Sequence, residues 1–310
     1  MAKYSIIVPA YNEEKSLGLF YDAVTPMMES LQEDYELIFI NDGSRDATKD
    51  VLLALAKKDK RVKVCHFSRN FGQQAALLCG LKEASGDAVI AMDADLQDPP
   101  EVAMEMIEKW KEGYEVVHGK RRKRKGETWF KKATARLFYR FTRKITGMEI
   151  LADSGDFKLY DRKVVDVLLS MNEHDRLLRA QVAWVGFKQT QVEFDRPERV
   201  AGETHYTLKK MVKLAESGIF PNTDYTLTLP IKLGLLLGFC SFACLITFIV
   251  LSCLNVWFGG LVAWLFPTVG MLGAILLVCQ GLANMHTAMI YREVQNRPKY
   301  VLSEKYNFDE

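Results

Sequence analysis

The sequence predicts an α/β fold with a mostly parallel sheet flanked by helices, followed by amphipathic helices at a membrane surface and a two-helix transmembrane hairpin. Three observations lead to this prediction. Short apolar runs alternate with stretches of helical periodicity over residues 4–67. Basic residues interleave with aromatic ones over residues 120–144. Two long runs, residues 231–257 and 261–290, then contain no acidic residue and no arginine.

The predicted sheet starts from short runs that are rich in β-branched, aromatic and other apolar residues. These runs are Tyr4–Pro9, Glu36–Ile40, Val62–Phe67 and the buried strand Asp87–Met92. Between the first three, residues 14–31 and 47–58 carry apolar side chains at helical spacing, and Ser44 or Asp46 is placed to cap the second helix. Strands joined through helices pair in parallel, and ligands bind beyond the carboxyl ends of such strands.

The polar motifs of this region each follow a predicted strand. They are Ala10–Glu14, Asn41–Ser44, Ser68–Gly72 and Asp93–Asp95. The sequence has no G-x-G-x-x-G after the first strand and no P-loop, which argues against a nicotinamide Rossmann enzyme and a P-loop phosphotransferase. The motifs favour a nucleotide site of another kind, in which Asp42 accepts hydrogen bonds from a base or ribose and Tyr11 packs against the base. For each residue singly, a turn-forming or capping role is the alternative.

Asp93 and Asp95 directly follow the last of these runs. In an extended segment, residues i and i+2 point the same way, so both carboxylates are predicted to face one side. Two hard oxygen ligands can hold a divalent cation against a diphosphate, and Gln97 adds a neutral oxygen at the next alternate position. Pro99 and Pro100 end the strand and start a loop or helix. A pair of solvated turn residues is the alternative.

Each long apolar run exceeds the roughly 20 residues that a helix needs to cross a bilayer. Basic residues collect on one side of the predicted hairpin, namely Lys209, Lys210, Lys213, Lys232, Arg292, Arg297 and Lys299. The positive-inside rule therefore places both flanks and both termini in the cytoplasm of a multi-pass protein of the cell membrane. We expect no exported leader before the first strand, and the six cysteines show neither zinc spacing nor a disulfide framework.

The chain is accordingly divided into four parts. They are a cytoplasmic domain (residues 1–206), a juxtamembrane amphipathic segment (207–230), the transmembrane hairpin (231–291) and a cytoplasmic tail (292–310). On a chain with such a hairpin, the basic stretch fits a helix on anionic lipid headgroups better than a nucleic-acid groove. We therefore expect the lipid bilayer, and no nucleic acid, as a partner. The apolar hairpin also favours packing against copies of the chain.

Four motifs together resemble the GT-A glycosyltransferases of the family-2 type. They are Val8–Glu14, Asn41–Ser44, Asp93–Pro100 and Asp153–Leu159. The likeness is closer to the polyprenyl-phosphate hexosyltransferases, namely the dolichyl-phosphate mannose synthase group and the bactoprenol glucosyltransferases, and it covers the chain almost end to end. It implies a GT-A sheet, a nucleotide sugar donor, a polyprenyl phosphate acceptor, and Mg²⁺ or Mn²⁺ as cofactor.

The resemblance also assigns roles to residues. Contacts to the nucleoside fall to residues that follow the first two strands, namely Pro9, Tyr11, Glu13 and Asp42. Contacts to the sugar nucleotide and its metal fall to Asp93 and Asp95, and Gln97 matches a position that completes the metal shell. Ala94 lies between the two aspartates and Arg69 lies in the Ser68–Gly72 motif, and we expect both to line the donor site.

One departure from the group concerns the donor phosphates. After residues 199–204 the group usually presents lysine before tyrosine, whereas here His205 stands before Tyr206. Lysine is a permanent cation, but histidine is one only when it is protonated. We therefore expect Arg199 to bind the donor phosphates as a permanent cation, and His205 to bind them as a cation only when it is protonated. On the acceptor side, we expect Arg122 of the basic stretch to contact the lipid phosphate.

The implied reaction is an inverting displacement. An acceptor phosphate is anionic near neutral pH, so it attacks the anomeric carbon directly, while metal and arginines neutralise the departing nucleoside diphosphate. Asp156 orients the acceptor or takes its proton. The expected donor is UDP-glucose or UDP-N-acetylglucosamine. Two alternatives stay open: a catalytically silent membrane scaffold, and a processive polysaccharide synthase, although Gln181–Trp184 lacks the arginine of the Gln-x-x-Arg-Trp pattern.

Overall fold

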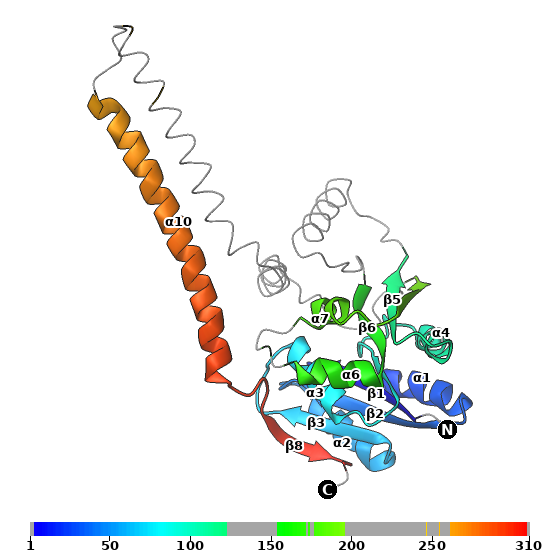
Figure 1. Ribbon diagram of the computed structural model, residues 1–310. Helices are drawn as coiled ribbons and strands as arrows, with labels where there is room; N and C mark the ends of the chain where they lie inside the picture. Colours follow the sequence, from blue (N-terminus) through cyan, green and yellow to red (C-terminus); the bar gives the residue numbers. More distant parts are fainter. Residues whose placement is uncertain are drawn as a thin grey trace. The chain divides into compact units, whose positions relative to one another are not determined.

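A computed structural model describes residues 3–122, 154–171, 173, 177–195, 246, 254 and 261–308. The chain divides into two units, residues 1–218 with 298–310 and residues 219–297. The second apolar run lies in one long helix, α10 (Leu261–Gln295; Figure 1). Among the helices described, none is both long and apolar enough to cross a membrane. Nearly all of the first apolar run lies outside the described residues, so the two-helix hairpin stays a prediction.

The strands that the structure describes form one eight-stranded sheet in the order β7-β5-β6-β4-β1-β2-β3-β8. They are β1 (Lys3–Ala10), β2 (Asp34–Asn41), β3 (Val62–Phe67), β4 (Ala88–Ala91), β5 (Val116–Arg121), β6 (Ser154–Asp161), β7 (Gln189–Phe194) and β8 (Leu302–Tyr306). The pairs among β1 to β4 are parallel, as is β5 with β7, whereas β6 and β8 run antiparallel to their neighbours. The prediction of a mostly parallel sheet is therefore confirmed.

The strand order changes direction beside β1. The chain proceeds from β1 to β2 and β3 on one side, and β4 then pairs with the other side of β1. In α/β sheets, ligands bind beyond the carboxyl ends of the strands at such a change of direction. The motifs after β1 and β4 lie at this switch point.

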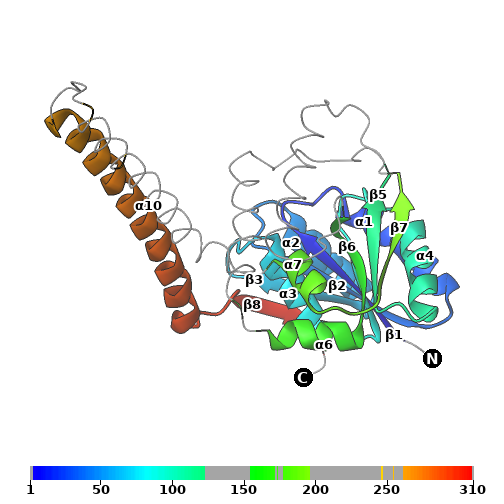
Figure 2. The ribbon, with the colours of Figure 1, turned by 45° about the horizontal axis from the view of Figure 1, so that its top comes forward.

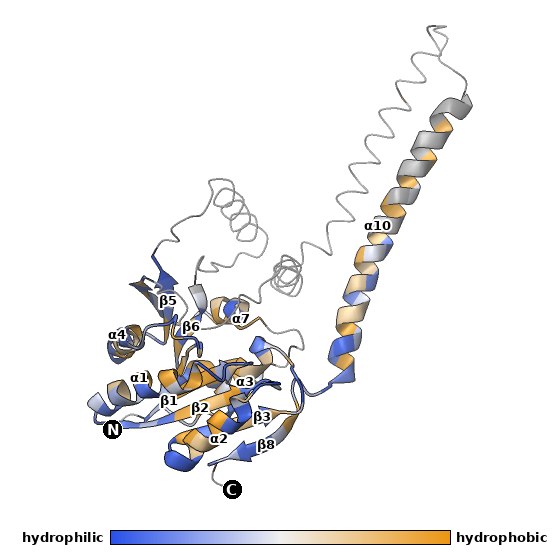
Figure 3. Ribbon diagram, turned by 180° about the vertical axis from the view of Figure 1, so that it is seen from behind, coloured by the Kyte–Doolittle hydropathy of each residue, from blue (hydrophilic) through white to orange (hydrophobic). Residues whose placement is uncertain are grey.

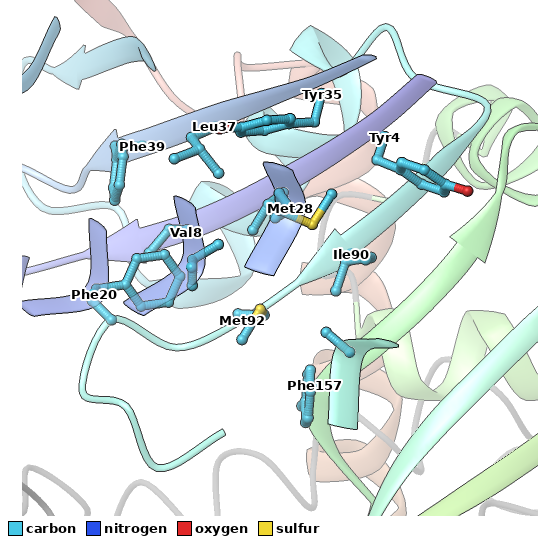
Figure 4. Packing of buried hydrophobic residues seen from close by; sticks show 14 of the residues in the cluster. Tyr4, Val8, Phe20, Met28, Tyr35, Leu37, Phe39, Ile90, Met92 and Phe157 are labelled. Carbon is cyan, nitrogen blue, oxygen red and sulfur yellow. The ribbon is translucent and has the colours of Figure 1, made fainter. Parts of the chain in front are cut away.

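Helices cover both faces of the sheet (Figure 2). One face packs against α1 (Leu17–Ser30), α2 (Thr48–Lys58) and α4 (Pro100–Lys111), and the other against α3 (Gln73–Glu83), α6 (Arg162–Ser170) and α7 (Leu178–Trp184). Figure 4 shows the first layer from close by. There Phe20 of α1 meets Phe39 of β2 edge to face, with ring centroids 6.0 Å apart. Alternate residues along β1 feed the two layers, as its burial on both faces requires.

Two predicted helix boundaries can be compared with the structure. Helix α4 begins at Pro100, where a proline replaces a backbone N–H that would lack an intrahelical partner. At the start of α2, the Oδ1 atom of Asp46 accepts a hydrogen bond from the backbone N–H of Thr48 at 3.1 Å. Of the two capping residues predicted, Asp46 therefore serves the helix, whereas Ser44 bonds elsewhere.

The segment set apart as a tail contains a strand of the sheet. Leu302 pairs with Phe67 and Tyr306 with Val64, so β8 closes the edge beyond β3. Just before β8, the ring of Tyr300 stacks on that of Phe67 at 4.9 Å, and the backbone N–H of Ser68 donates to the carbonyl of Val301. Figure 3 shows β2 as hydrophobic and β8 as largely hydrophilic, which suits a central and an edge strand. Residues 298–310 therefore belong with the first unit rather than in a separate tail.

A buried carboxylate, Glu36 on β2, ties the amino-terminal end of the sheet together. Its Oε1 atom accepts hydrogen bonds from the Ser5 hydroxyl at 2.6 Å and from the Ser85 backbone N–H at 2.7 Å. Its Oε2 atom lies 2.7 Å from the Lys63 ammonium, and its side chain is only 3% exposed. Burial alone would raise the pKa of Glu36, but these partners lower it from 4.5 to about 2.

We expect the Glu36→Gln variant to lose about 2–3 kcal/mol of unfolding free energy near pH 7, because the depressed pKa represents stability held by the ionised form. That stability is present above the unfolded pKa and is lost as the pH falls through the folded one. The difference between wild type and variant should therefore shrink as the pH falls from about 5 to about 2. Unfolding measured over this pH range tests it, with the exposed Glu105→Gln variant as control. A difference that is independent of pH contradicts it.

Candidate functional site

The loops after β1 and β2 are bonded to each other at the switch point. The backbone N–H of Asn12 donates to the Ser44 hydroxyl at 2.9 Å, and the backbone N–H of Arg45 donates to Asn12 Oδ1 at 2.9 Å. The backbone N–H of Glu13 donates to the Thr48 hydroxyl at 2.8 Å. Asn12 has φ +58°, a left-handed conformation that asparagine tolerates better than most residues. The two motifs therefore form one structural unit.

Three predicted nucleoside residues lie in the first of these loops or just before it. Pro9 is half-buried near the end of β1, and Tyr11 is half-buried directly after it. The carboxylate of Glu13 accepts a hydrogen bond from the Ser16 hydroxyl at 2.5 Å, beside the start of α1. Each residue therefore stands at the edge of the sheet where ligands bind, and Glu13 also has a local structural role.

Asp42 is held inside the protein by the loop that follows β3. Its carboxylate accepts hydrogen bonds from the backbone N–H groups of Phe71 at 2.6 Å and Gly72 at 2.9 Å, and from the Asn70 side chain at 2.9 Å. It is only 3% exposed, and burial raises its pKa although the two N–H groups oppose the rise. A carboxylate has about four acceptor positions, and hydrogen bonds from this loop occupy most of those of Asp42. The alternative to nucleoside binding, a structural role in a turn, therefore applies to Asp42 whether or not it also binds a nucleoside.

Gly43 explains how the loops after β2 and β3 approach so closely. It has φ +65°, and a Cβ atom there would lie 2.4 Å from the carbonyl carbon of Arg69. Only glycine fits this position without displacing the backbone. Arg69 itself is exposed, and its guanidinium lies over the Phe71 ring at 4.4 Å.

The segment that carries Asp93 and Asp95 is a turn, so the prediction of an extended segment was wrong. Strand β4 ends at Ala91, and Leu96 has φ +57°. The rule that residues i and i+2 face one side therefore does not apply. Two hydrogen bonds stabilise the turn. The backbone N–H of Asp93 donates to Asp98 Oδ2 at 3.2 Å, and the backbone N–H of Gln97 donates to Asp95 Oδ1 at 3.1 Å.

Burial distinguishes the members of this turn. Asp95 is 6% exposed and Gln97 9%, and Ala94 is buried between the two aspartates, whereas Asp93 is half-buried. Asp98, which the sequence reasoning did not single out, is 1% exposed and accepts the Asp93 backbone bond. In a sequence, an acidic residue directly after Gln97 is indistinguishable from an ordinary solvated charge, so the structural role of Asp98 was not visible there.

The chemistry of the donor set agrees with a hard divalent cation. The Asp95 carboxylate and the Gln97 amide supply the oxygen ligands that Mg²⁺ and Mn²⁺ accept. Among the described residues, no group of three or more His, Cys, Asp or Glu side chains is arranged to hold a metal ion. A metal at this turn would therefore need further oxygens from a substrate, as a donor diphosphate provides.

Asp156 on β6 is the centre of a second charged cluster. The Nε atom of Arg179 on α7 donates to Asp156 Oδ1 at 2.8 Å, and the Asp156 side chain is 7% exposed. Lys158, two residues along the strand, is 1% exposed. Burial would raise the pKa of Asp156, but the nearby Arg179, Lys158 and Arg121 charges hold that pKa below its usual range. Burial lowers the pKa of Lys158 to about 8 although Asp156 opposes this.

The charges around Asp156 distinguish between its two predicted roles, which are to orient the acceptor and to take its proton. A carboxylate whose pKa is held low is a weak proton acceptor at neutral pH, so of the two predicted roles the geometry favours orientation over proton transfer. The sequence reasoning missed Arg179, because nothing in its neighbourhood marks it and its partner lies on another element.

The remaining predicted ligands are exposed or lie outside the described residues. Arg122 follows β5, is exposed, and has its Nη1 atom 3.9 Å from Asp195 Oδ2. Arg199 and His205 fall outside the described residues, as do the basic stretch from residue 123 and the amphipathic segment 207–230. Their predicted roles stay predictions.

The sequence matches the family described as Glycosyl transferase family 2 over residues 5–169, which is more than half of the chain. The chain belongs to glycosyl transferase family 2. It is therefore a glycosyltransferase, and the matched residues include the loops after β1, β2 and β4 and the Asp156 strand. The recognition made from the sequence motifs is confirmed.

Relatives within glycosyl transferase family 2 match over nearly the whole chain. An uncharacterized glycosyltransferase of Bacillus subtilis is 44% identical, with 99% of this chain and 95% of the relative covered. A prophage-derived bactoprenol glucosyl transferase of Shigella flexneri is 37% identical, with 98% of each chain covered. Among solved structures, mannosyl-3-phosphoglycerate synthase from Rubrobacter xylanophilus aligns with a TM-score of 0.50 and 18% identity, over 70% of this chain and 71% of that one. This likeness supports the GT-A-like fold.

Proposed function

We propose that this family-2 glycosyltransferase moves glucose from a uridine nucleotide sugar to a polyprenyl phosphate of the undecaprenyl type. The observation that carries the proposal is the 37% identity to bactoprenol glucosyl transferases over 98% of both chains. This match extends far beyond residues 5–169, so it includes the regions that follow the sugar-nucleotide fold. UDP-N-acetylglucosamine is the alternative donor.

The same match supports a proposed location at the cell membrane. Residues 231–257 and 261–290 are uncharged apart from Lys232, and a polyprenyl acceptor resides in a bilayer. We infer that these residues anchor the enzyme in the cell membrane, with the sugar-nucleotide domain on the cytoplasmic side. Basic residues from 120 onward then face anionic headgroups and the acceptor phosphate.

The reaction requires three tasks of this chain. The loops after β1 and β2, which form one unit, receive the nucleoside. Their position at the carboxyl ends of parallel strands favours this role. The Asp93–Gln97 turn receives the sugar and diphosphate. The buried Asp156, paired with Arg179, is assigned to orienting the acceptor. Because the acceptor arrives as an anion, its oxygen attacks the anomeric carbon without a strong base and inverts it.

Asp95 and Gln97 are the residues that would hold a divalent cation here. When bound, Mg²⁺ or Mn²⁺ neutralises charge on the leaving diphosphate. Asp93, which is less buried than Asp95, is assigned to the sugar nucleotide.

Transfer to lipid tests the proposal. Membranes that contain the protein are incubated with undecaprenyl phosphate, Mg²⁺ or Mn²⁺, and a panel of labelled uridine and guanosine nucleotide sugars. We expect label from UDP-glucose in the lipid fraction, with one hexose per lipid. Absence of label in that fraction with every donor refutes the proposal, and a polymeric product indicates a processive synthase instead.

A further inference from the structure

A five-residue stretch, residues 70–74, contacts three of the site aspartates directly. We call it the bridging segment. Its first three residues bond to the Asp42 carboxylate after β2, as described above. Its fourth, Gln73, donates from Nε2 to Asp93 Oδ1 at 3.1 Å, beyond the end of β4. The bridging segment therefore spans from the nucleoside side of the site to the diphosphate side.

The last residue of the bridging segment, Gln74, reaches a third aspartate. Its Nε2 atom lies 3.5 Å from Asp156 Oδ2, at the outer limit of a hydrogen bond. Its Oε1 atom accepts a hydrogen bond from the backbone N–H of Leu178 at 3.2 Å, at the start of α7. The next residue of α7 is Arg179, the partner of Asp156. The Gln74 amide therefore bonds Asp156 through its nitrogen and, through its oxygen, the residue next to the Asp156 partner Arg179.

The bridging segment presents these amides from a rigid base. Gln73 and Gln74 are the first two residues of α3, and the following turns bury Ala76, Leu77 and Cys79 in the core. Both glutamines are half-buried. Side chains on the first turn of a packed helix have little freedom, and that fixes the groups they bond. A neutral amide also donates to a carboxylate without adding a charge to the site.

We propose that Gln73 and Gln74 are positioning residues that fix Asp93 for the sugar nucleotide and Asp156 for the acceptor. The proposal rests on the function proposed above. Neither glutamine needs to touch substrate, since each acts through the carboxylate it holds. Displacements of about 1 Å in a reacting constellation can cost on the order of 100-fold in rate, so loss of one such bond should be measurable.

The test compares near-isosteric variants of the full-length protein. Gln73→Met keeps the size of the side chain and removes the donor, whereas Gln73→Lys keeps an N–H donor of similar reach. Gln74→Met removes both bonds of Gln74. Gln191→Met, at an exposed position of β7, is the matched control. Each variant is assayed for kcat, for KM of UDP-glucose and of undecaprenyl phosphate, and for melting temperature.

We expect Gln73→Met to lower kcat/KM for the donor by about 10- to 100-fold, and Gln73→Lys to restore most of it, because a hydrogen bond to a charged group is worth that much. Gln74→Met should instead raise KM for the acceptor more than KM for the donor. The control should match wild type. A purely structural role would lower the melting temperature of the methionine variants without separating the two KM values.

Two results overturn the positioning proposal. One is equal activity of Gln73→Met and Gln73→Lys, and the other is a Gln74→Met variant with unchanged KM for the acceptor. Failure of the function proposed above would look different, because wild type itself would then leave undecaprenyl phosphate unlabelled. In that case, binding of UDP-glucose with Mn²⁺ is measured by calorimetry, and equal affinities of wild type and Gln73→Met refute the role of Gln73.

Discussion

The Asp95→Asn variant is expected to lose at least about 100-fold in the rate of sugar transfer, the scale associated with removing a group that stabilises leaving-group charge. Asparagine keeps an oxygen that can accept the Gln97 backbone bond, so the turn should persist. What disappears is the negative charge next to Gln97 that a divalent cation requires. Transfer of label from UDP-glucose to the lipid fraction, measured across a range of Mg²⁺ and Mn²⁺ concentrations, tests this expectation.

A matched control is the same substitution at Asp166 on α6. That side chain is 63% exposed and lies 3.8 Å from the Arg162 guanidinium, so Asp166→Asn should transfer like the wild type. An Asp95→Asn variant that retains its melting temperature and transfers within tenfold of the wild type would exclude Asp95 as a metal ligand. Loss of activity together with loss of folding would leave the turn, rather than the metal, as the cause.

The Asp156→Asn variant is expected to lose about 3 kcal/mol of unfolding free energy, because it removes the carboxylate that pairs with Arg179 and offsets the charge of the buried Lys158. An uncompensated buried charge is among the most destabilising changes that a single substitution can make. For a domain of this size the melting temperature should fall by roughly 6–12 °C. Thermal unfolding of the purified full-length protein measures it.

A second substitution identifies the cause of that loss. In Asp156→Asn combined with Lys158→Met, the buried ammonium that lost its partner is gone as well, so part of the melting temperature should return. If the double variant is less stable than Asp156→Asn alone, the charge argument is wrong and packing of residue 158 dominates. If Asp156→Asn melts like the wild type, the ion pair contributes nothing to stability.

The regular part of the fold was predictable because local patterns determine it. The first three predicted strands coincide with β1, β2 and β3, and each end lies within about two residues of the predicted one. They are Tyr4–Pro9, Glu36–Ile40 and Val62–Phe67. Buried parallel strands are short, apolar and β-branched, so local patterns reveal them. Strand β8 was not predictable in this way. Its residues, Leu302–Tyr306, are mostly polar, and their partner strand lies at the other end of the sequence.

The candidate site was predictable as a set of residues but not as a geometry. The motifs after β1, β2 and β4 were recognised because each follows a predicted strand, and the strand order puts those after β1 and β4 at the switch point. The left-handed Leu96 turns the Asp93–Asp95 pair out of an extended path, and alternation of side chains cannot reveal this. Gln73 and Arg179 were missed because each bonds a carboxylate on another element, which one sequence does not record.

The pairing of β8 with β3 sets the order of events during synthesis. Phe67 is made long before its partner Leu302, and at roughly 5–20 residues per second the ribosome needs roughly 10–50 s to cover the interval. Throughout that time the outer edge of β3 has backbone groups that lack their final partner, which is a template for wrong pairing. The nascent sugar-nucleotide domain therefore reaches its complete sheet only after α10 has been translated, and its maturation waits for the segment proposed to enter the membrane.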